Sequence, residues 1–292
     1  MDRLQISTVI TPQIIGDEKF FARKALAKDF SGLMNPLIGV EHFQMKSDVL
    51  GPHANAGMAS VTYIFEKSAS YRSLDSRGNE KVITPGSMLW TTTGTGIVDS
   101  GFPETEGAIV DGIKMYIHSS TDQKHSEPTN VFIGTDQIPE IRKRGLRVKI
   151  VSGETSGTKN NTVLPHPLTL LHIFLERGNQ FTHKLPAKWS GTIFVIGGRF
   201  DLSTNQETFE LDEGMVISMA NSVHVEALTL LGITDCELLL FSSPPINEKI
   251  VSKGSMAMES LAALIKSIVG YKNGKMGFIK IKGQIRNIIR PT

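Results

Sequence analysis

The sequence predicts an all-β protein with two small antiparallel β-barrels in one chain and a single helix near the C-terminus. Short runs rich in Val, Ile, Thr, Phe and Tyr are separated by Gly, Pro, Asn and Asp about every ten residues, which is typical of antiparallel sandwiches and barrels. One order of strands and turns occurs twice, and clear helical spacing occurs once. With 292 residues and 40% hydrophobic content, the chain is long enough for two domains that each bury a core.

The first copy of the pattern lies in the N-terminal half. Residues 60–66 read Ser-Val-Thr-Tyr-Ile-Phe-Glu, which predicts a strand. Residues 75–79 (Asp-Ser-Arg-Gly-Asn) carry turn chemistry, and Pro85 with Gly86 supplies a second turn. Residues 87–90 (Ser-Met-Leu-Trp) then predict another strand, so this region has the order strand, turn, strand, turn, strand.

The second copy repeats that order in the C-terminal half. Strands are expected at residues 192–196, 207–211 and 215–218, with glycine-containing turns between them. Gly214 precedes its apolar strand just as Gly86 precedes the strand in the first copy. The weak duplication predicts two domains, at residues 1–142 and 143–292.

The helix is expected close to the C-terminus. Leu261, Leu264, Ile265 and Ile268 follow the i, i+3, i+4, i+7 spacing of a helical face, and Asn273-Gly274 ends it. We expect this helix to pack on a barrel. The basic tail that follows has few aromatic residues, which favours a packed terminus over a nucleic-acid-binding arm.

Composition gives no sign of a charged partner. Lys and Arg total 31 against 29 Asp and Glu, so no field of one sign favours nucleic acid or an acidic membrane. The lone Cys236 lies in an apolar run that reads as a buried strand, and one thiol makes no internal disulfide. No run reaches the roughly 20 apolar residues of a spanning helix, and no secretion signal is evident. These features predict a cytoplasmic protein. Dinucleotide fingerprints, nucleophile elbows and phosphate loops are also missing from the sequence.

Several stretches together resemble the pirin family, in the family's own order. Residues 35–43 (Asn-Pro-Leu-Ile-Gly-Val-Glu-His-Phe) are similar to the segment that precedes the family's first metal ligands. Further similar stretches are residues 51–63, 85–98, 151–157, 246–251 and 254–258. Because the similarity covers nearly the whole chain, it is far more specific than any single motif.

The resemblance implies two cupin domains, that is jelly-roll β-barrels, with one metal ion, usually iron, in the N-terminal barrel. Some family members are dioxygenases of flavonols such as quercetin, and others act through protein partners such as transcriptional regulators. The family's ligands are a His-x-His pair and a His-x-Glu pair. Alternate residues of a strand point to the same face, so each pair directs two side chains into the barrel.

This sequence departs from that ligand set. The first pair is His53 and Asn55, the second is Asp99 and Gly101, and only His53 matches the family. Since an amide is a weak ligand and glycine has no side chain, we expect poor iron binding here. The alternative is a polar pocket without metal, in which Asp99 pairs with His53 or with Arg72. Candidate wall residues by strand position are Met58, Tyr63, Trp90 and Met115, and ordinary core packing explains each of them equally well.

The second barrel offers another set of ligand types. His224 and Glu226 form an i, i+2 pair after the Gly214 turn, and His183 lies on the strand that matches the first ligand strand. Two imidazoles and a carboxylate would suit a metal ion. Surface or capping roles for His183, His224 and Glu226 are the favoured interpretation.

Two hypotheses about function follow. The first is a pirin-like protein without a cofactor, which binds a small aromatic or acidic molecule in the first barrel or a protein partner. The alternative is a quercetin 2,3-dioxygenase-type enzyme with one divalent metal (Fe, or Mn, Ni or Zn) held by His53 and Asp99, with Asn55 as a weak third ligand. The sequence favours the first hypothesis because the ligand set is altered. It indicates neither the natural ligand nor the oligomeric state.

Overall fold

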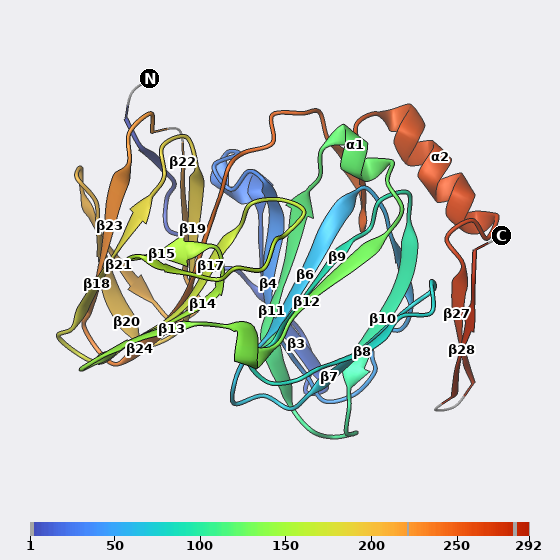
Figure 1. Cartoon of the computed structure of the whole chain (residues 1–292), viewed down its shortest axis with the longest axis horizontal. Helices are drawn as coiled ribbons and strands as arrows, with labels where there is room; N and C mark the ends of the chain where they lie inside the picture. The colour runs from blue at the N-terminus through green and yellow to red at the C-terminus, as the bar shows by residue number, and fades with distance from the viewer. Residues whose placement is uncertain (1–2, 221, 283–284, 292) are drawn as a thin grey trace. The chain divides into compact units, whose positions relative to one another are not determined.

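The computed structural model describes residues 3–220, 222–282 and 285–291 and divides into two compact units (Figure 1). Residues 15–22, 40–135 and 246–292 form one unit, which we call the N-terminal barrel. Residues 1–14, 23–39 and 136–245 form the other, the C-terminal barrel. Both units are jelly rolls of one seven-stranded and one four-stranded sheet, so the predicted all-β fold with two cupin domains is confirmed.

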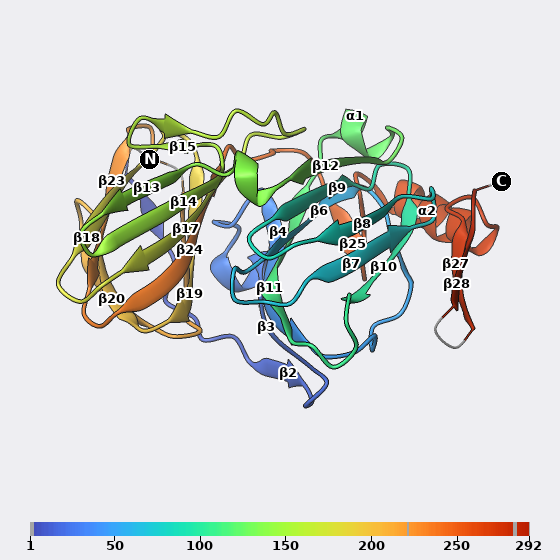
Figure 2. The same cartoon turned by 60° about the horizontal axis from the view of Figure 1, so that its bottom comes forward.

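The N-terminal barrel places its seven-stranded sheet opposite a four-stranded one (Figure 2). The larger sheet has the order β12 (Thr129–Ile133), β9 (Met88–Thr92), β6 (Met58–Ile64), β11 (Val110–His118), β4 (Leu37–Met45), β3 (Phe20–Leu26) and β2 (Ile14–Gly16). The smaller has the order β5 (His53–Asn55), β10 (Ile97–Pro103), β7 (Tyr71–Asp75) and β8 (Glu80–Ile83).

The C-terminal barrel repeats this architecture, which supports the duplication inferred from the sequence. Its larger sheet has the order β1 (Gln5–Ile6), β22 (Val216–Ala220), β19 (Ser190–Gly197), β24 (Cys236–Ser243), β17 (Thr169–Leu175), β14 (Leu146–Ser152) and β13 (Glu140–Lys143). Its smaller sheet has the order β18 (Gln180–Leu185), β23 (Glu226–Gly232), β20 (Arg199–Ser203) and β21 (Thr208–Asp212).

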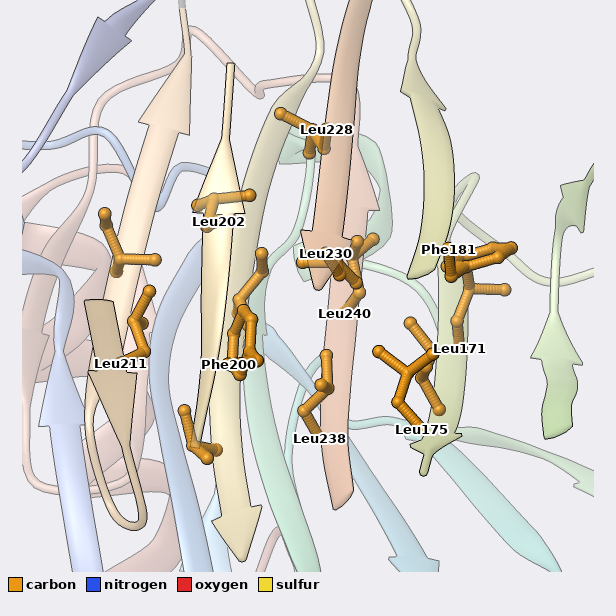
Figure 3. Packing of buried hydrophobic residues seen from close by; sticks show 14 of the residues in the cluster. Leu171, Leu175, Phe181, Phe200, Leu202, Leu211, Leu228, Leu230, Leu238 and Leu240 are labelled. Carbon is orange, nitrogen blue, oxygen red and sulfur yellow. The ribbon is translucent and has the colours of Figure 1, made fainter. Parts of the chain in front are cut away.

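Leucine and phenylalanine side chains from both sheets fill the C-terminal barrel (Figure 3). Phe200 and Leu202 alternate with more exposed neighbours along β20, so one face of this strand lines the core. Cys236 is buried at the edge of the same core, as predicted from its apolar run.

The remaining elements are short. Two-residue or three-residue strands form the pairs β15 (Glu154–Thr155) with β16 (Thr158–Lys159) and β25 (Val251–Lys253) with β26 (Met256–Met258). A hairpin of β27 (Phe278–Lys282) and β28 (Ile285–Ile289) follows the C-terminal helix. The helices are α1 (Thr121–Lys124), α2 (Leu261–Lys272) and the 3-10 turns η1 (Ala27–Phe30) and η2 (Thr135–Gln137).

The C-terminal helix α2 matches its prediction. Its N-cap Ser260 accepts a hydrogen bond from the amide of Ala263, and Asn273 ends the helix. Leu264 is 3% exposed and packs with Met258 on the outer face of the four-stranded sheet. This contact explains why the C-terminal segment belongs to the N-terminal barrel.

The two units are interleaved along the chain and are not separated at residue 142. Strand β1 pairs with β22, an edge of the C-terminal barrel, because the backbone groups of that edge offer it hydrogen bonds. The tail from residue 246 onward joins the N-terminal barrel in turn. Among the described residues, no helix is long and apolar enough to span a membrane.

Candidate functional site

Strand alternation divides the four-stranded sheet of the N-terminal barrel into two faces. Ala54 and Val98 pair across β5 and β10 and pack outward with Met258 and Leu264. His53 pairs with Asp99 in the same ladder, so both lie on the opposite, inner face. Four positions therefore line the interior from this sheet, as predicted: His53, Asn55, Asp99 and Gly101.

Three of these side chains bind one another. His53 Nε2 lies 3.3 Å from Asp99 Oδ1, and Asn55 Nδ2 donates to the same oxygen at 2.5 Å. His53 Nδ1 lies 3.2 Å from the carbonyl oxygen of Gly51. The predicted pairing of Asp99 with His53 is confirmed. The alternative with Arg72 is wrong, because that guanidinium binds the carboxylates of Glu104 and Glu80.

The ring of Tyr71 takes the space beside Gly101. A side chain at Gly101 would place its Cβ 1.8 Å from the Tyr71 Oη. The two residues are diagonal neighbours on β10 and β7, since Gly101 pairs with Ser73 and Tyr71 lies two residues earlier. Tyr71 is 6% exposed, and its ring lies 6.0 Å from that of Phe43 across the interior. A phenol thus lies where the family pattern has a carboxylate ligand.

Strand β11 adds a positive charge to this interior. Lys114 and Tyr116 are alternate residues of β11, and the Lys114 Nζ lies 5.9 Å from the centre of the Tyr116 ring. Burial lowers the pKa of Lys114, but electrostatic interactions with Tyr116, Asp99, Tyr71 and Glu41 outweigh it and raise the pKa above the ordinary value. This ammonium is therefore charged at neutral pH.

The phenols beside Lys114 remain protonated. Burial raises the pKa of Tyr116 to about 12 and also raises the pKa of Tyr71. Both hydroxyls can donate hydrogen bonds at neutral pH, whereas the carboxylates of Asp99 and Glu41 are acceptors. The interior therefore offers donors and acceptors side by side.

The other half of the barrel interior is apolar, with Phe43, Met45, Ile64 and Leu89 in one buried cluster. Among the predicted wall residues, Met58 lies on the inner face of β6. It is an even number of residues from Thr62, which pairs with Lys114 in the neighbouring strand. The other three lie on the opposite face, because they occupy alternate positions; they are Tyr63, Trp90 and Met115. These three do not line the pocket; they are buried, which agrees with the alternative of ordinary core packing.

These residues do not suit the metal ion that the family pattern implies. Asn55 turns its NH₂ group toward Asp99, while its Oδ1 is buried and has no hydrogen-bond partner in the described structure. Tyr71 fills the space of the fourth ligand, and the charge of Lys114 acts on Asp99. A positive charge that acts on this carboxylate opposes the binding of a divalent cation. Among the described residues, no group of three or more His, Cys, Asp or Glu side chains has metal-site geometry.

The second candidate set lies in the C-terminal barrel and is dispersed. His183 is 3% exposed, its Nδ1 lies 3.1 Å from Thr155 Oγ1, and burial lowers its pKa to about 4. His224 is exposed. Glu226 is buried and accepts hydrogen bonds from Ser222 Oγ at 2.6 Å and Asn205 Nδ2 at 3.1 Å. The predicted surface role holds for His224 but is wrong for His183 and Glu226, which are buried and hydrogen-bonded to neighbouring polar side chains.

Sequence reasoning missed Tyr71, Lys114 and Tyr116. The alternation of polar and apolar residues over 111–118 is a strand signal that could have placed Lys114 and Tyr116 on one face. No local signal could have paired Tyr71 with Gly101, because that contact depends on the register of β7 against β10.

Comparison with known proteins agrees with this fold over nearly the whole chain. Residues 21–117 match the pirin family model, and residues 170–277 match the model of the pirin C-terminal cupin domain. Pirin-1 of Arabidopsis thaliana is 25% identical over 94% of this chain and 95% of its own length.

Solved structures show the same fold. A quercetin 2,3-dioxygenase from Acinetobacter baumannii aligns with a TM-score of 0.81 at 19% identity, over 93% of this chain and 96% of its own. A bacterial pirin from Escherichia coli in complex with nickel(II) aligns with a TM-score of 0.62 at 16% identity, over 84% of this chain and 100% of its own. With both family models matched in order on two cupin units, the chain belongs to the pirin family.

Proposed function

We propose that this chain is a binding member of the pirin family, which takes a small hydroxylated aromatic molecule in its N-terminal barrel without a metal ion. The observation that carries the proposal is the contact at Gly101, where the Tyr71 hydroxyl occupies the space of a ligand side chain. Lys114 complements it, because it places a positive charge in the same interior, where that charge interacts electrostatically with Asp99. A fixed protein cation thereby replaces a metal ion.

The chemistry of the interior favours a neutral ligand. Asp99 and Glu41 carry two formal negative charges against the one positive charge of Lys114, so a strongly acidic molecule would meet net repulsion. Phenolic hydroxyl groups both donate and accept, which matches the mixture of Tyr71, Tyr116 and the carboxylates. The apolar cluster around Phe43 and Leu89 can pack against an aromatic ring.

The test uses quercetin as the probe and protein that has been treated with EDTA. Isothermal titration calorimetry should show saturable binding of one quercetin per chain, with no loss of quercetin absorbance in air. Lys114→Met should weaken binding about tenfold, because a charged hydrogen-bond donor is lost from a desolvated site. Lys67→Met, a change at an exposed lysine of the same unit, is the matched control and should leave the affinity unchanged.

Three results would contradict the binding proposal. Absence of saturable binding would do so, and so would equal affinity in Lys114→Met and the wild type. A requirement for added metal would favour the second candidate instead.

The second candidate is a metal-dependent dioxygenase of the quercetin 2,3-dioxygenase type. The observation that favours it is the close approach of His53 and Asp99, at 3.3 Å, in a fold that resembles the Acinetobacter enzyme. It predicts oxygen consumption with quercetin after incubation with ferrous iron, and loss of that activity in His53→Ala. No oxygen uptake with iron-loaded protein would exclude it.

A further inference from the structure

A cavity lies outside the barrel interior, beneath the C-terminal helix. It has a volume of about 670 Å³ and lies between α2, the loop around Thr95 and the segment that follows α1. All of its lining residues belong to the N-terminal unit. Gly96 helps to shape it, since a side chain there would place its Cβ 2.4 Å from the Cε of Met276. The cavity is therefore a built feature of this unit.

Cationic side chains dominate its polar lining. Arg77, Lys124, Lys266 and Lys275 line the cavity, whereas Glu127 is the one acidic residue among its lining residues. Glu127 is already paired with Arg77, at 2.9 Å. The lining therefore keeps an excess of positive charge, even with His125 counted as neutral.

Two of these cations have donors without acceptors. Lys124 is 0% exposed, and its Nζ has no hydrogen-bond partner among the described residues. The Nε of Arg77 is likewise buried and unpartnered in the described structure. Burial lowers the pKa of Lys124. A buried hydrogen-bond donor without an acceptor is costly, so such donors are normally satisfied by an acceptor. Two of them on one cavity indicate an acceptor that comes from outside the chain.

Carboxylates near Lys124 do not supply that acceptor. Glu248 and Glu259 attract it electrostatically, yet neither makes a hydrogen bond to its Nζ. Glu248 Oε2 accepts from the amide and hydroxyl of Thr121, and Glu259 Oε1 lies 3.1 Å from His125 Nε2. The other oxygen of Glu259, Oε2, is buried and has no hydrogen-bond partner among the described residues, so it makes no hydrogen bond to the Lys124 Nζ in this structure.

We propose that this cavity is a binding site for a small organic anion, a phosphate ester or carboxylate carried on an apolar body. The anion would accept hydrogen bonds from Lys124 and Arg77, with Lys266 and Lys275 at the rim. The apolar body would pack on Met258, Ala263 and Met276, which line the same cavity. The site is separate from the barrel interior and does not depend on the function proposed above.

Phenyl phosphate is the probe, because it joins a dianion to a small aromatic body. Calorimetry of the full chain at low salt should give saturable binding of one molecule per chain. Lys124→Met keeps the length and the apolar part of the side chain but removes the ammonium, and should weaken binding tenfold or more. Lys272→Met, an exposed lysine of α2 that does not line the cavity, should bind like the wild type.

Absence of saturable binding to the wild type overturns the proposal, as does a loss of less than tenfold in Lys124→Met. If Lys124→Met does not fold, as judged by circular dichroism, Lys266→Met decides the matter, since both Lys266 and Lys272 are exposed on the same helix. Weakening of threefold or more in Lys266→Met, with none in Lys272→Met, supports the site; any smaller difference refutes it.

Discussion

The buried imidazole of His183 should make the C-terminal barrel sensitive to mild acid. Burial lowers its pKa from 6.5 to about 4 in the folded chain, and the unfolded chain keeps the ordinary value. Above pH 6.5 neither state takes up the proton, so His183 has no destabilising effect there. As the pH falls from 6.5 toward about 4, only the unfolded state gains the proton, and the folded state loses stability.

The size of this loss follows from the shift. The shift in the pKa of His183 from 6.5 to about 4 corresponds to a total loss of roughly 3 kcal/mol in the free energy of unfolding. Roughly 2–3 kcal/mol of this loss is reached at about pH 4.5. His183 is 3% exposed, so solvent screening reduces the effect little. That amount is a substantial share of the stability of a typical domain.

The sequence supplies a convenient reporter for this barrel. It has two tryptophans, Trp90 and Trp189, and Trp189 packs against the core of the C-terminal barrel. In a Trp90→Phe background, urea unfolding followed by fluorescence therefore reports that unit. The wild-type His183 background should lose roughly 2–3 kcal/mol more between neutral pH and about pH 4.5 than His183→Gln, which has no titrating group. Equal losses in both backgrounds would refute this reasoning.

Three further predictions concern packing and reactivity. Gly101→Glu should lower the thermal midpoint, because its Cβ would lie 1.8 Å from Tyr71 Oη, and adding Tyr71→Ala should recover part of the loss. Leu264→Ala should cost about 2–5 kcal/mol in urea unfolding, while Leu261→Ala, at a position 62% exposed, should change stability by less than about 0.5 kcal/mol; similar losses would contradict the packing of α2. Cys236, whose pKa burial raises to about 11, should react with a thiol reagent much more slowly in native than in urea-unfolded protein at neutral pH; equal rates would show that the thiol is accessible.

Much of the fold could be predicted from the sequence because its signals are local. The run at residues 60–66 became β6 at Met58–Ile64, and the turn residues Asp75 to Asn79 join β7 to β8. The spacing of Leu261 and Leu264 marked α2, whose first turn starts where Ser260 caps it. Hydrophobic period and turn chemistry act within about ten residues, so they can be read without tertiary contacts.

The interleaving of the units and the filled ligand position could not be read in this way. The pairing of β1 with β22 joins residues more than 200 positions apart, between Gln5 and Ala220. The contact of Tyr71 with Gly101 depends on register and on the direction of one ring. The sequence showed that Asn55 and Gly101 depart from the family's metal ligands. It did not show which side chains take the place of those ligands.

We propose that the N-terminal barrel uses Tyr71 and Lys114 at the place where the pirin family pattern has metal ligands. Elemental analysis after anaerobic incubation with ferrous iron, manganese, nickel or zinc tests it most directly, with Asp99→Ala as the control. We expect metal far below one ion per chain in every sample and no difference between the wild type and Asp99→Ala. About one ion per chain in the wild type, lost in Asp99→Ala, would contradict it.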